Sequence, residues 1–324
     1  MNRSADPSPI QDPSTELTRL AARLQWPEQG QASVFLEGAG EVGTCGEQTP
    51  VPTASLAKVM AAYVVLTAHP LVNSEDQGPQ IQVDSTAQEE SVSLVESTVP
   101  LVEGQELSER KLLELMLIPS GSNAARLLAR WHAGDEASFV HRMNEAAVAL
   151  GMVRTTYADV CGIDPATRST SDDQILLARA VMAIPAFRET VARYSTGLRG
   201  IGLLCNTNRL LVRPGVVGLK TGTTTPAGGN LLWALRVGRR GHGRLVLGAV
   251  MNQQPHTNLS TSREAVRSTS AALITSLRRE LCPPPANPVA RAWHAIRERS
   301  LHAKGWFGYH SPYYRSRIVA RARA

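Results

Sequence analysis

Ser55 and Lys58 lie three residues apart in the stretch PTASLAKVM, residues 52–60. On a helix this spacing places both side chains on one face, about 5–6 Å apart at Cβ. A serine hydroxyl is a weak nucleophile, but a nearby amine can take its proton if burial or a second cation lowers the pKa of that amine. A helix N-terminus also favours a developing oxyanion. The pair therefore indicates nucleophilic chemistry, although taken alone it more often means an N-cap serine and a solvated lysine.

Two later stretches carry side chains that would complete such a site. Ser120-Gly121-Ser122 follows Pro119 directly, in a loop between two expected helices, about 65 residues after Ser55. Lys220-Thr221-Gly222-Thr223 follows about 100 residues later, on an expected strand. Lys220 is the candidate for the second cation beside Lys58.

The order and spacing of these three stretches resemble the penicillin-binding D-alanyl-D-alanine carboxypeptidases, which are serine peptidases. Their signature is S-x-x-K, then S-x-N, then K-T-G, and the serine β-lactamases share it. The resemblance covers about residues 30–280. Further segments resemble the same family: Leu117-Ile118-Pro119-Ser120-Gly121, Met143-Asn144-Glu145, Leu150-Gly151-Met152, Gly162-Ile163-Asp164, Asn206-Thr207-Asn208 and Gly218-Leu219-Lys220-Thr221-Gly222.

The resemblance implies a role for each matched residue in acyl transfer. Ser55 would attack the peptide carbonyl and form an acyl-enzyme, with Lys58 as the general base. Ser120 would pass a proton to the leaving D-alanine amine. The substrate would be the peptidoglycan stem peptide, and β-lactam antibiotics would be covalent inhibitors.

Substrate binding would fall to the strand of the third motif. Lys220 and Thr221 would bind the terminal carboxylate, and Gly222 would leave room for an extended peptide along the strand. By the same resemblance, the backbone N–H groups of Ser55 and Thr223 would form the oxyanion hole.

The chain departs from the family pattern in the second motif. The family has Asn at the third position, where this chain has Ser122 followed by Asn123. A serine is shorter than an asparagine and carries one donor rather than two. Asn123 would take over the contact with the substrate only if the loop shifted by one residue. Losing such a contact would cost about 1–3 kcal/mol.

Three alternatives remain open on the same motifs. A class A β-lactamase needs a glutamate in an E-x-x-L-N stretch between the second and third motifs, and Glu136, Glu145 and Glu189 do not fit it. A non-catalytic penicillin- or peptidoglycan-binding protein would have lost turnover with the motif asparagine. An esterase or amidase would use the same nucleophile on another substrate.

The surrounding elements predict an α+β fold. The run from Ser55 to about Ala68 is apolar almost all round, which is typical of a helix buried in a core. Two short strands precede it, at 31–36 and 41–44, and helices follow from 108 to 182. Strand-like segments return after Gly200, and an amphipathic helix over 260–281 closes the order. We expect an antiparallel sheet flanked by terminal helices, plus an all-helical lobe.

Composition separates a near-neutral body from a basic tail. Of 34 Lys and Arg and 28 Asp and Glu, the segment from Pro283 carries eight and one, which leaves a net charge of −1 for the remainder. This argues against nucleic-acid binding by the whole chain. We expect a polar N-terminal segment over 1–27, a catalytic domain over 28–282, and a basic aromatic tail over 283–324. The tail suits contact with a membrane surface or an anionic polymer.

Neither a metal nor another cofactor is expected. The four cysteines are too far apart for a C-x-x-C pair or a metal knuckle, and the histidines are scattered. The N-terminus has no apolar signal segment, yet the substrate that the resemblance implies lies outside the cytoplasmic membrane. The expected location is therefore the cell envelope, reached by a route that the sequence does not reveal.

Overall fold

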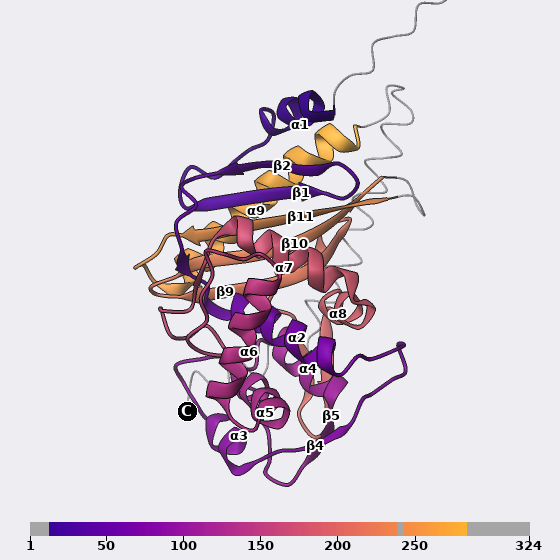
Figure 1. Cartoon of the computed structure of the whole chain (residues 1–324), viewed down its shortest axis with the longest axis vertical. Coiled ribbons are helices and arrows are strands. Elements are labelled where there is room, and N and C mark those ends of the chain that lie inside the picture. Colours follow the sequence, from indigo (N-terminus) through magenta and orange to yellow (C-terminus); the bar gives the residue numbers. More distant parts are fainter. Residues whose placement is uncertain (1–12, 239–242, 284–324) are drawn as a thin grey trace, which may run out of the picture.

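A five-stranded antiparallel sheet forms the centre of the computed structural model, which describes residues 13–238 and 243–283. Its strands run in the order β2-β1-β11-β10-β9, so the first strands in the chain pair with the last (Figure 1). Gln31 lies opposite Met251, for example. The strands are β1 (Gln31–Leu36), β2 (Gly40–Cys45), β9 (Val216–Thr224), β10 (Gly228–Val237) and β11 (Arg244–Gln253).

The two terminal helices cover one face of this sheet. They are α1 (Pro13–Ala21) and α9 (Leu259–Leu281). Val266, Leu273 and Leu277 of α9 are buried against sheet residues such as Trp233, as the helical spacing of the sequence predicts. Burial of this apolar stripe is the main force that holds α9 on the sheet.

A helical lobe, which we define as residues 57–191, covers the other face. Helices α7 and α8 contact the sheet, and the remaining helices lie beyond them (Figure 1). The helices are α2 (Ala57–Ala68), α3 (Ser85–Glu90), α4 (Glu109–Leu117), α5 (Ser122–Ala133), α6 (Glu136–Ala149), α7 (Ser171–Ala183) and α8 (Pro185–Val191). The predicted α+β architecture is confirmed.

The lobe is not entirely helical. Strands β4 (Gln80–Gln82) and β5 (Glu106–Ser108) pair within it, and β3 (Val51–Pro52) pairs with β6 (Arg168–Ser169) at its border. A further ladder, β7 (Ser195–Leu198) with β8 (Gly202–Cys205), and a 3₁₀ turn, η2 (Arg209–Val212), lie between the lobe and β9. These elements are two to four residues long, and so short a run shows almost no periodicity in a sequence.

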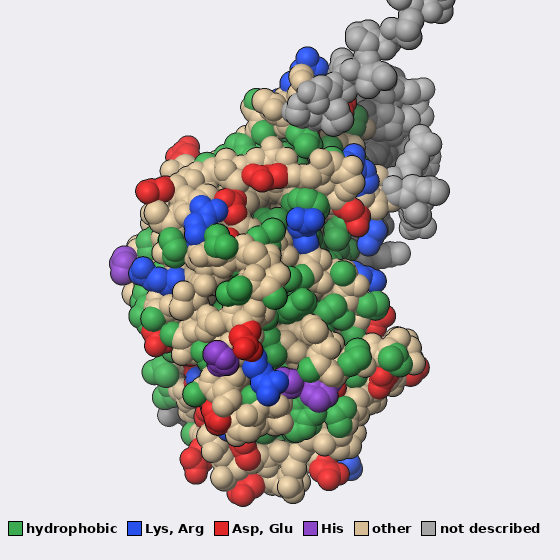
Figure 2. Space-filling view, viewed as in Figure 1, with side chains coloured by type: hydrophobic (Ala, Val, Ile, Leu, Met, Phe, Trp, Pro, Cys, Tyr) green, Lys and Arg blue, Asp and Glu red, His purple; other side chains and the backbone are tan. Residues whose placement is uncertain are grey.

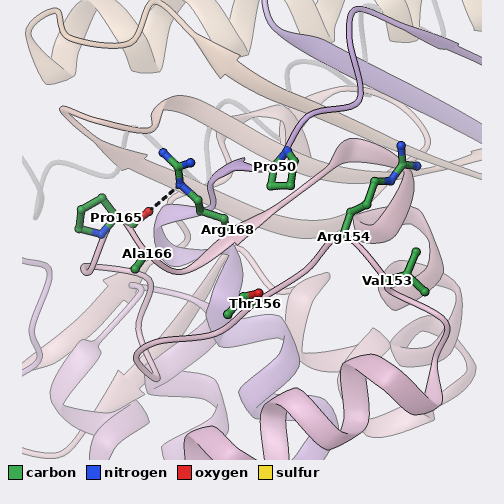
Figure 3. A pocket seen from close by; sticks show the side chains of 7 residues that line it. All are labelled: Pro50, Val153, Arg154, Thr156, Pro165, Ala166 and Arg168. Atoms are coloured by element: carbon green, nitrogen blue, oxygen red, sulfur yellow. Dashed lines mark hydrogen bonds between the residues drawn. The ribbon is translucent and has the colours of Figure 1, made fainter.

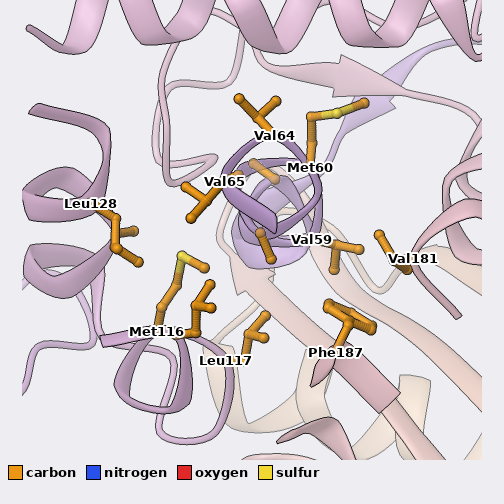
Figure 4. Packing of buried hydrophobic residues seen from close by; sticks show 14 of the residues in the cluster. Val59, Met60, Val64, Val65, Met116, Leu117, Leu128, Val181 and Phe187 are labelled. Atoms are coloured by element: carbon orange, nitrogen blue, oxygen red, sulfur yellow. The ribbon is translucent and has the colours of Figure 1, made fainter. Parts of the chain in front are cut away.

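Helix α2 lies at the centre of the lobe and is buried on almost every side from Ala57 to Leu66, where only Tyr63 is partly exposed. Val59, Met60, Val64 and Val65 point outward from it in several directions and meet side chains of α4, α5, α7 and α8 (Figure 4). A helix with no solvent face can keep a charged side chain only if that side chain is paired or changes its protonation state. Lys58, on the first turn of α2, is 0% exposed.

The structure differs from the sequence predictions in two details. After the helix that ends near Ala68, the sequence predicts helices only from 108 onward, yet the stretch 80–97 contains α3. This helix begins because the Asp84 side chain accepts a hydrogen bond from the N–H of Ala87. Ser55 was expected in the α-helix itself, but it lies in a separate 3₁₀ turn, η1 (Ala54–Leu56), just before α2.

Charged side chains are interspersed over the described surface. Blue and red groups alternate on the face shown in Figure 2, in keeping with the near-neutral charge of the body. None of the helices in residues 13–238 and 243–283 has the length and apolar character needed to cross a membrane. The predicted basic tail, 283–324, lies outside the described residues apart from Pro283.

Candidate active site

Ser55 and Lys58 form a direct hydrogen bond at the start of α2. Lys58 Nζ lies 3.1 Å from Ser55 Oγ. Ser55 is partly exposed whereas Lys58 is fully buried, so the hydroxyl faces solvent and the amine lies behind it. This is the geometry in which an amine can take a proton from an attacking hydroxyl.

Two glycines allow other segments to approach the Ser55 turn closely. Ala54 adopts a positive φ of 48°, which fixes an uncommon backbone conformation beside the nucleophile. A Cβ on Gly162 would lie 1.9 Å from Ala54 O, and a Cβ on Gly222 would lie 3.0 Å from Ser55 N. Any side chain at either position would push the turn away from β9 or from the loop after α6.

Ser120 joins the two buried lysines. Its backbone carbonyl accepts a hydrogen bond from Lys58 Nζ at 3.0 Å, and its hydroxyl accepts one from Lys220 Nζ at 2.9 Å. Ser120 has a positive φ of 70°, which turns the loop between α4 and α5 toward both amines. The structure therefore brings together Ser55, Lys58, Ser120 and Lys220 from three separate segments of the chain.

Burial is the main electrostatic influence on both lysines. It lowers the pKa of Lys58, against smaller opposing effects of Cys161, Glu96 and Asp159. It lowers the pKa of Lys220 well below its ordinary value, and the charge of Lys58 lowers it further. The charge of Lys58 thus acts on Lys220, whereas the main influence on the pKa of Lys58 is burial rather than the charge of Lys220. In both lysines burial therefore favours the neutral amine, which is the form that a general base requires.

Strand β9 presents the third motif at the edge of the sheet. Among the described strands it pairs only with β10, so its other edge is open to an added strand. Thr221 and Thr223 are partly exposed there, and Gly222 is buried against the Ser55 turn. Thr221 Oγ1 donates to Thr207 Oγ1 at 2.7 Å. The Thr207 side chain was not predicted as part of the site.

Ser122 and Asn123 are both buried, and neither faces the open side of the site. Ser122 Oγ lies 2.9 Å from Lys58 Nζ. Asn123 makes four hydrogen bonds: it accepts one from the N–H of Val99 and donates to Val99 O, Ala87 O and Ser91 Oγ. The suggestion that Asn123 contacts the substrate was therefore wrong, because its amide is committed to the loop before α4.

Sequence reasoning also missed a charged pair behind Ser122. Arg126 lies one turn further along α5 and binds both carboxylate oxygens of Glu96, each at 2.9 Å. The four-residue spacing of Ser122 and Arg126 places them on one face of α5. The spacing of Ser122 and Arg126 can be read from the sequence. Glu96 lies in a loop, and the sequence of that loop has no periodicity that would place Glu96 beside them.

Two cavities on the described surface have linings that do not include Ser55. One, of about 680 Å³, is lined by residues around Arg154 and Arg168 (Figure 3). Its lining includes Arg168 of β6, the strand that pairs with Val51 and Pro52 just before the Ser55 turn. The other, of about 570 Å³, lies between β1 and α7. The Ser55 site is instead an open edge of a strand, which suits an extended peptide.

The glutamates considered for a β-lactamase lie in other contacts. Glu136 pairs with Arg130 at 2.9 Å, Glu145 with His141 at 3.3 Å, and Glu189 with Arg110 at 3.7 Å. None of the three is placed against Ser55 in these contacts. In the described part of the chain, no three His, Cys, Asp or Glu side chains come together as a set of metal ligands, and all four cysteines are free thiols.

Comparison with known proteins gives consistent matches. Residues 42–254 match the family described as D-alanyl-D-alanine carboxypeptidase. The chain is 33% identical over 218 residues to the D-alanyl-D-alanine carboxypeptidase DacD of Escherichia coli, which covers 65% of this chain and 55% of DacD. It is 35% identical over 145 residues to DacB2 of Mycobacterium tuberculosis, which covers 42% of this chain and 50% of DacB2. The chain spans about half the length of these curated relatives.

Solved structures resemble the chain over most of its length. The Streptomyces K15 DD-transpeptidase is 25% identical with a TM-score of 0.65, over 78% of this chain and 98% of that one. An evolved penicillin-binding protein homolog from Mycobacterium tuberculosis is 25% identical with a TM-score of 0.67, over 81% and 96%.

Proposed function

The chain belongs to the D-alanyl-D-alanine carboxypeptidase family, and from that premise we propose that it is a serine-type carboxypeptidase that removes the terminal D-alanine of the peptidoglycan pentapeptide. The observation that carries this proposal is the 3.1 Å contact between the partly exposed Ser55 hydroxyl and the buried Lys58 amine. Burial lowers the pKa of Lys58, and a neutral amine in that position is a general base.

The reaction would proceed through an ester on Ser55. Ser55 Oγ bonds to the carbonyl carbon of the terminal D-alanyl-D-alanine bond, and its proton passes to Lys58 Nζ. The C–N bond breaks as the Ser120 hydroxyl delivers its proton to the D-alanine amine and takes in turn the proton that Lys58 had received. Water then adds to the ester carbonyl with Lys58 as its base, the ester C–O bond breaks, and Lys58 returns that proton to Ser55 Oγ as the shortened peptide leaves.

Strand β9 would hold the substrate during these steps. The substrate pairs with the open edge of β9 as an extended strand. Its terminal carboxylate favours the protonated form of Lys220 and binds it. The Thr221 hydroxyl turns its proton from Thr207 to the same carboxylate when the substrate binds, and Thr207 can then donate to Thr221 Oγ1. The carbonyl oxygen points to the N–H groups of Ser55 and Thr223, which lie on neighbouring segments because Gly222 packs directly on the Ser55 turn.

The proposed partners and location follow from the proposed reaction. A β-lactam would acylate Ser55 and remain bound, since Glu136, Glu145 and Glu189 make other contacts and do not activate a deacylating water. The peptidoglycan stem peptide is exposed in the cell envelope, which we propose as the site of action. The basic tail would hold the protein near an anionic surface there.

The test is acylation by a fluorescent penicillin, followed by intact mass, with Ser55→Ala as the control. We expect one adduct on the parent and none on the variant, together with release of D-alanine from a pentapeptide substrate. An adduct without D-alanine release would instead indicate a non-catalytic penicillin-binding protein. Rapid penicillin turnover would indicate a β-lactamase. A parent chain without an adduct would overturn the proposal.

A further inference from the structure

The hydrogen-bond partners of Lys58 determine where its lone pair can point. Three oxygens lie within 3.1 Å of Nζ: Ser55 Oγ, Ser120 O and Ser122 Oγ. A neutral amine has two N–H groups and one lone pair. Ser120 O is a carbonyl and can only accept, so it takes one N–H. The lone pair faces Ser55 only if Ser122 takes the other N–H.

Ser122 takes that N–H when its own hydroxyl proton is directed elsewhere. The carboxylate of Glu96 is the available acceptor, because Arg126 holds it at 2.9 Å on the face of α5 that also carries Ser122. An interaction with the Ser122 side chain also contributes to the lowered pKa of this carboxyl. The backbone supports the same arrangement, because Ser122 N donates to Ser97 O at 2.8 Å and so holds the Glu96 loop against the start of α5.

Arg126 favours the ionised form of Glu96, the carboxylate that can accept a hydrogen bond from Ser122. Burial alone would raise the pKa of Glu96, but the two hydrogen bonds from Arg126 and its charge lower the pKa overall. Arg126 also lies 3.3 Å from Glu90 and 3.7 Å from Glu136, so its guanidinium is fixed by three carboxylates. The side chains of Glu96 and Arg126 are 9% and 17% exposed, which limits competition from water.

We propose that Glu96 and Arg126 are positioning residues: Glu96 orients the Ser122 hydroxyl, and Ser122 in turn orients the Lys58 lone pair toward Ser55. This inference rests on the proposed function and explains how the chain works with serine where its family has asparagine. An asparagine amide would accept from Lys58 through its own oxygen, without help from a carboxylate. A serine hydroxyl has no fixed direction and needs a second partner to set it.

The charged and titratable groups that face Lys58 come from several elements, and burial raises the pKa of one of them, the Cys161 thiol, to about 11. Glu96 lies on the loop after α3, Arg126 on α5, Cys161 and Asp159 on the loop after α6, and Lys220 on β9. Removal of the Glu96 charge leaves Arg126 facing Lys58 without its partner. That change favours neutral Lys58, so the fall in acylation rate at low pH should begin at a lower pH than in the parent.

The decisive variant is Glu96→Ala, measured as the second-order rate constant for acylation of Ser55 by the fluorescent penicillin from pH 5 to 9. We expect the plateau rate to fall about 10- to 100-fold, as a misdirected base would cause. The acid limb should move to lower pH, a shift that loss of structure alone does not produce. Glu136→Ala is the matched control: it removes another carboxylate from Arg126 but none from Ser122, and it should acylate within about twofold of the parent.

If Glu96→Ala also lowers stability, the same substitution made in the Ser122→Asn variant still tests the inference. In Ser122→Asn the amide oxygen replaces the oriented hydroxyl, so adding Glu96→Ala should cost less than about threefold in acylation. The inference would be overturned if Glu96→Ala lowered the acylation rate equally in the parent and in the Ser122→Asn variant. An unchanged acylation rate in Glu96→Ala would also overturn it. Either result leaves the proposed function standing if the parent is acylated, whereas a parent without an adduct overturns both.

Discussion

At the scale of single residues, the site places two lysines in different roles around one serine. Lys58 and Lys220 have the same side chain and both are buried, yet each contacts a different oxygen of Ser120. Lys58 also reaches Ser55, whereas Lys220 lies on the strand edge beside Thr221. The different positions of the two lysines therefore assign their proposed roles: Lys58 is the base, and Lys220 is the cation that binds the substrate carboxylate.

Replacement of Lys220 tests this division of roles. Lys220→Gln removes a charge-assisted hydrogen bond to the substrate carboxylate, which is worth about 1.5–3 kcal/mol. For a peptide ending in a free carboxylate, kcat/KM should fall about 10- to 150-fold. A peptide with an amidated C-terminus should be affected far less, because it has no carboxylate to lose. Equal losses on both peptides would contradict the assignment.

At the scale of elements, β9 must lie directly on the Ser55 turn. The Cβ of an alanine at position 222 would lie 2.8 Å from Thr53 O and 3.0 Å from Ser55 N. Contacts this short force the strand and the turn apart, and even small displacements at a reacting centre are costly.

Gly222→Ala should therefore reduce acylation about 100-fold while the protein remains folded. Gly197→Ala on β7 is the matched control, since a Cβ there meets nothing within 4 Å. Both variants can be compared by penicillin labelling and by thermal unfolding. A Gly222→Ala protein that is labelled at the parental rate would show that strand and turn have room to move.

Helix α4 begins with a buried carboxyl that makes stability depend on pH. Glu109 is 0% exposed and neither of its side-chain oxygens has a hydrogen-bond partner. Burial, followed by the nearby charge of Asp76, raises the pKa of Glu109 to about 7. The folded protein thus binds this proton more tightly than the unfolded chain. The stabilisation is fully present below the unfolded pKa near 4.5 and is lost as the pH rises through about 7.

Glu109→Gln removes this titration. The variant should exceed the parent in free energy of unfolding at pH 8 by on the order of 1–3 kcal/mol, and match it near pH 4.5. Urea unfolding at several pH values measures the difference. Glu106→Gln, at an exposed position on β5, serves as control and should leave the pH dependence unchanged. A constant difference between Glu109→Gln and the parent at every pH would contradict the titration.

The elements also show what could be predicted from the sequence. Among the long segments, α2 was predicted because it is apolar almost all round, and α9 because its apolar side chains recur at helical spacing. The strands β9 to β11 were predicted as apolar runs separated by glycines. Ser55, Lys58, Ser120 and Lys220 were predicted from short motifs at ordered spacings. The burial of Asn123 was not predicted, because it depends on hydrogen bonds to Ala87, Ser91 and Val99, and only the folded chain brings these together.

At the scale of the whole molecule, the catalytic body and the basic tail should be separable. The body contains the complete proposed site within the described residues, whereas the basic and aromatic side chains gather beyond Pro283. A chain ending at Pro283 should acylate with penicillin at the parental rate. It should lose binding to vesicles that contain anionic lipid, at about 1 kcal/mol per basic residue near the surface.

The control for that comparison is neutral vesicles, which neither form should bind strongly. Sedimentation with vesicles at low and physiological salt gives the measurement, since an electrostatic contact weakens as salt increases. Equal binding by the two forms would place membrane affinity in the body and contradict a role for the tail.

The pairing of β1 with β11 has a consequence for when the protein acquires its chemistry. The groups that meet at Ser120 come from positions 62 and 100 residues away, and the sheet that supports them closes only when the last strand joins the first. Contacts so distant along the chain form slowly and late in folding. A chain still being synthesised would carry Ser55 and Lys58 early but would lack the strand that holds substrate. Activity would therefore begin only at the end of folding, and fragments released before that point would be inert.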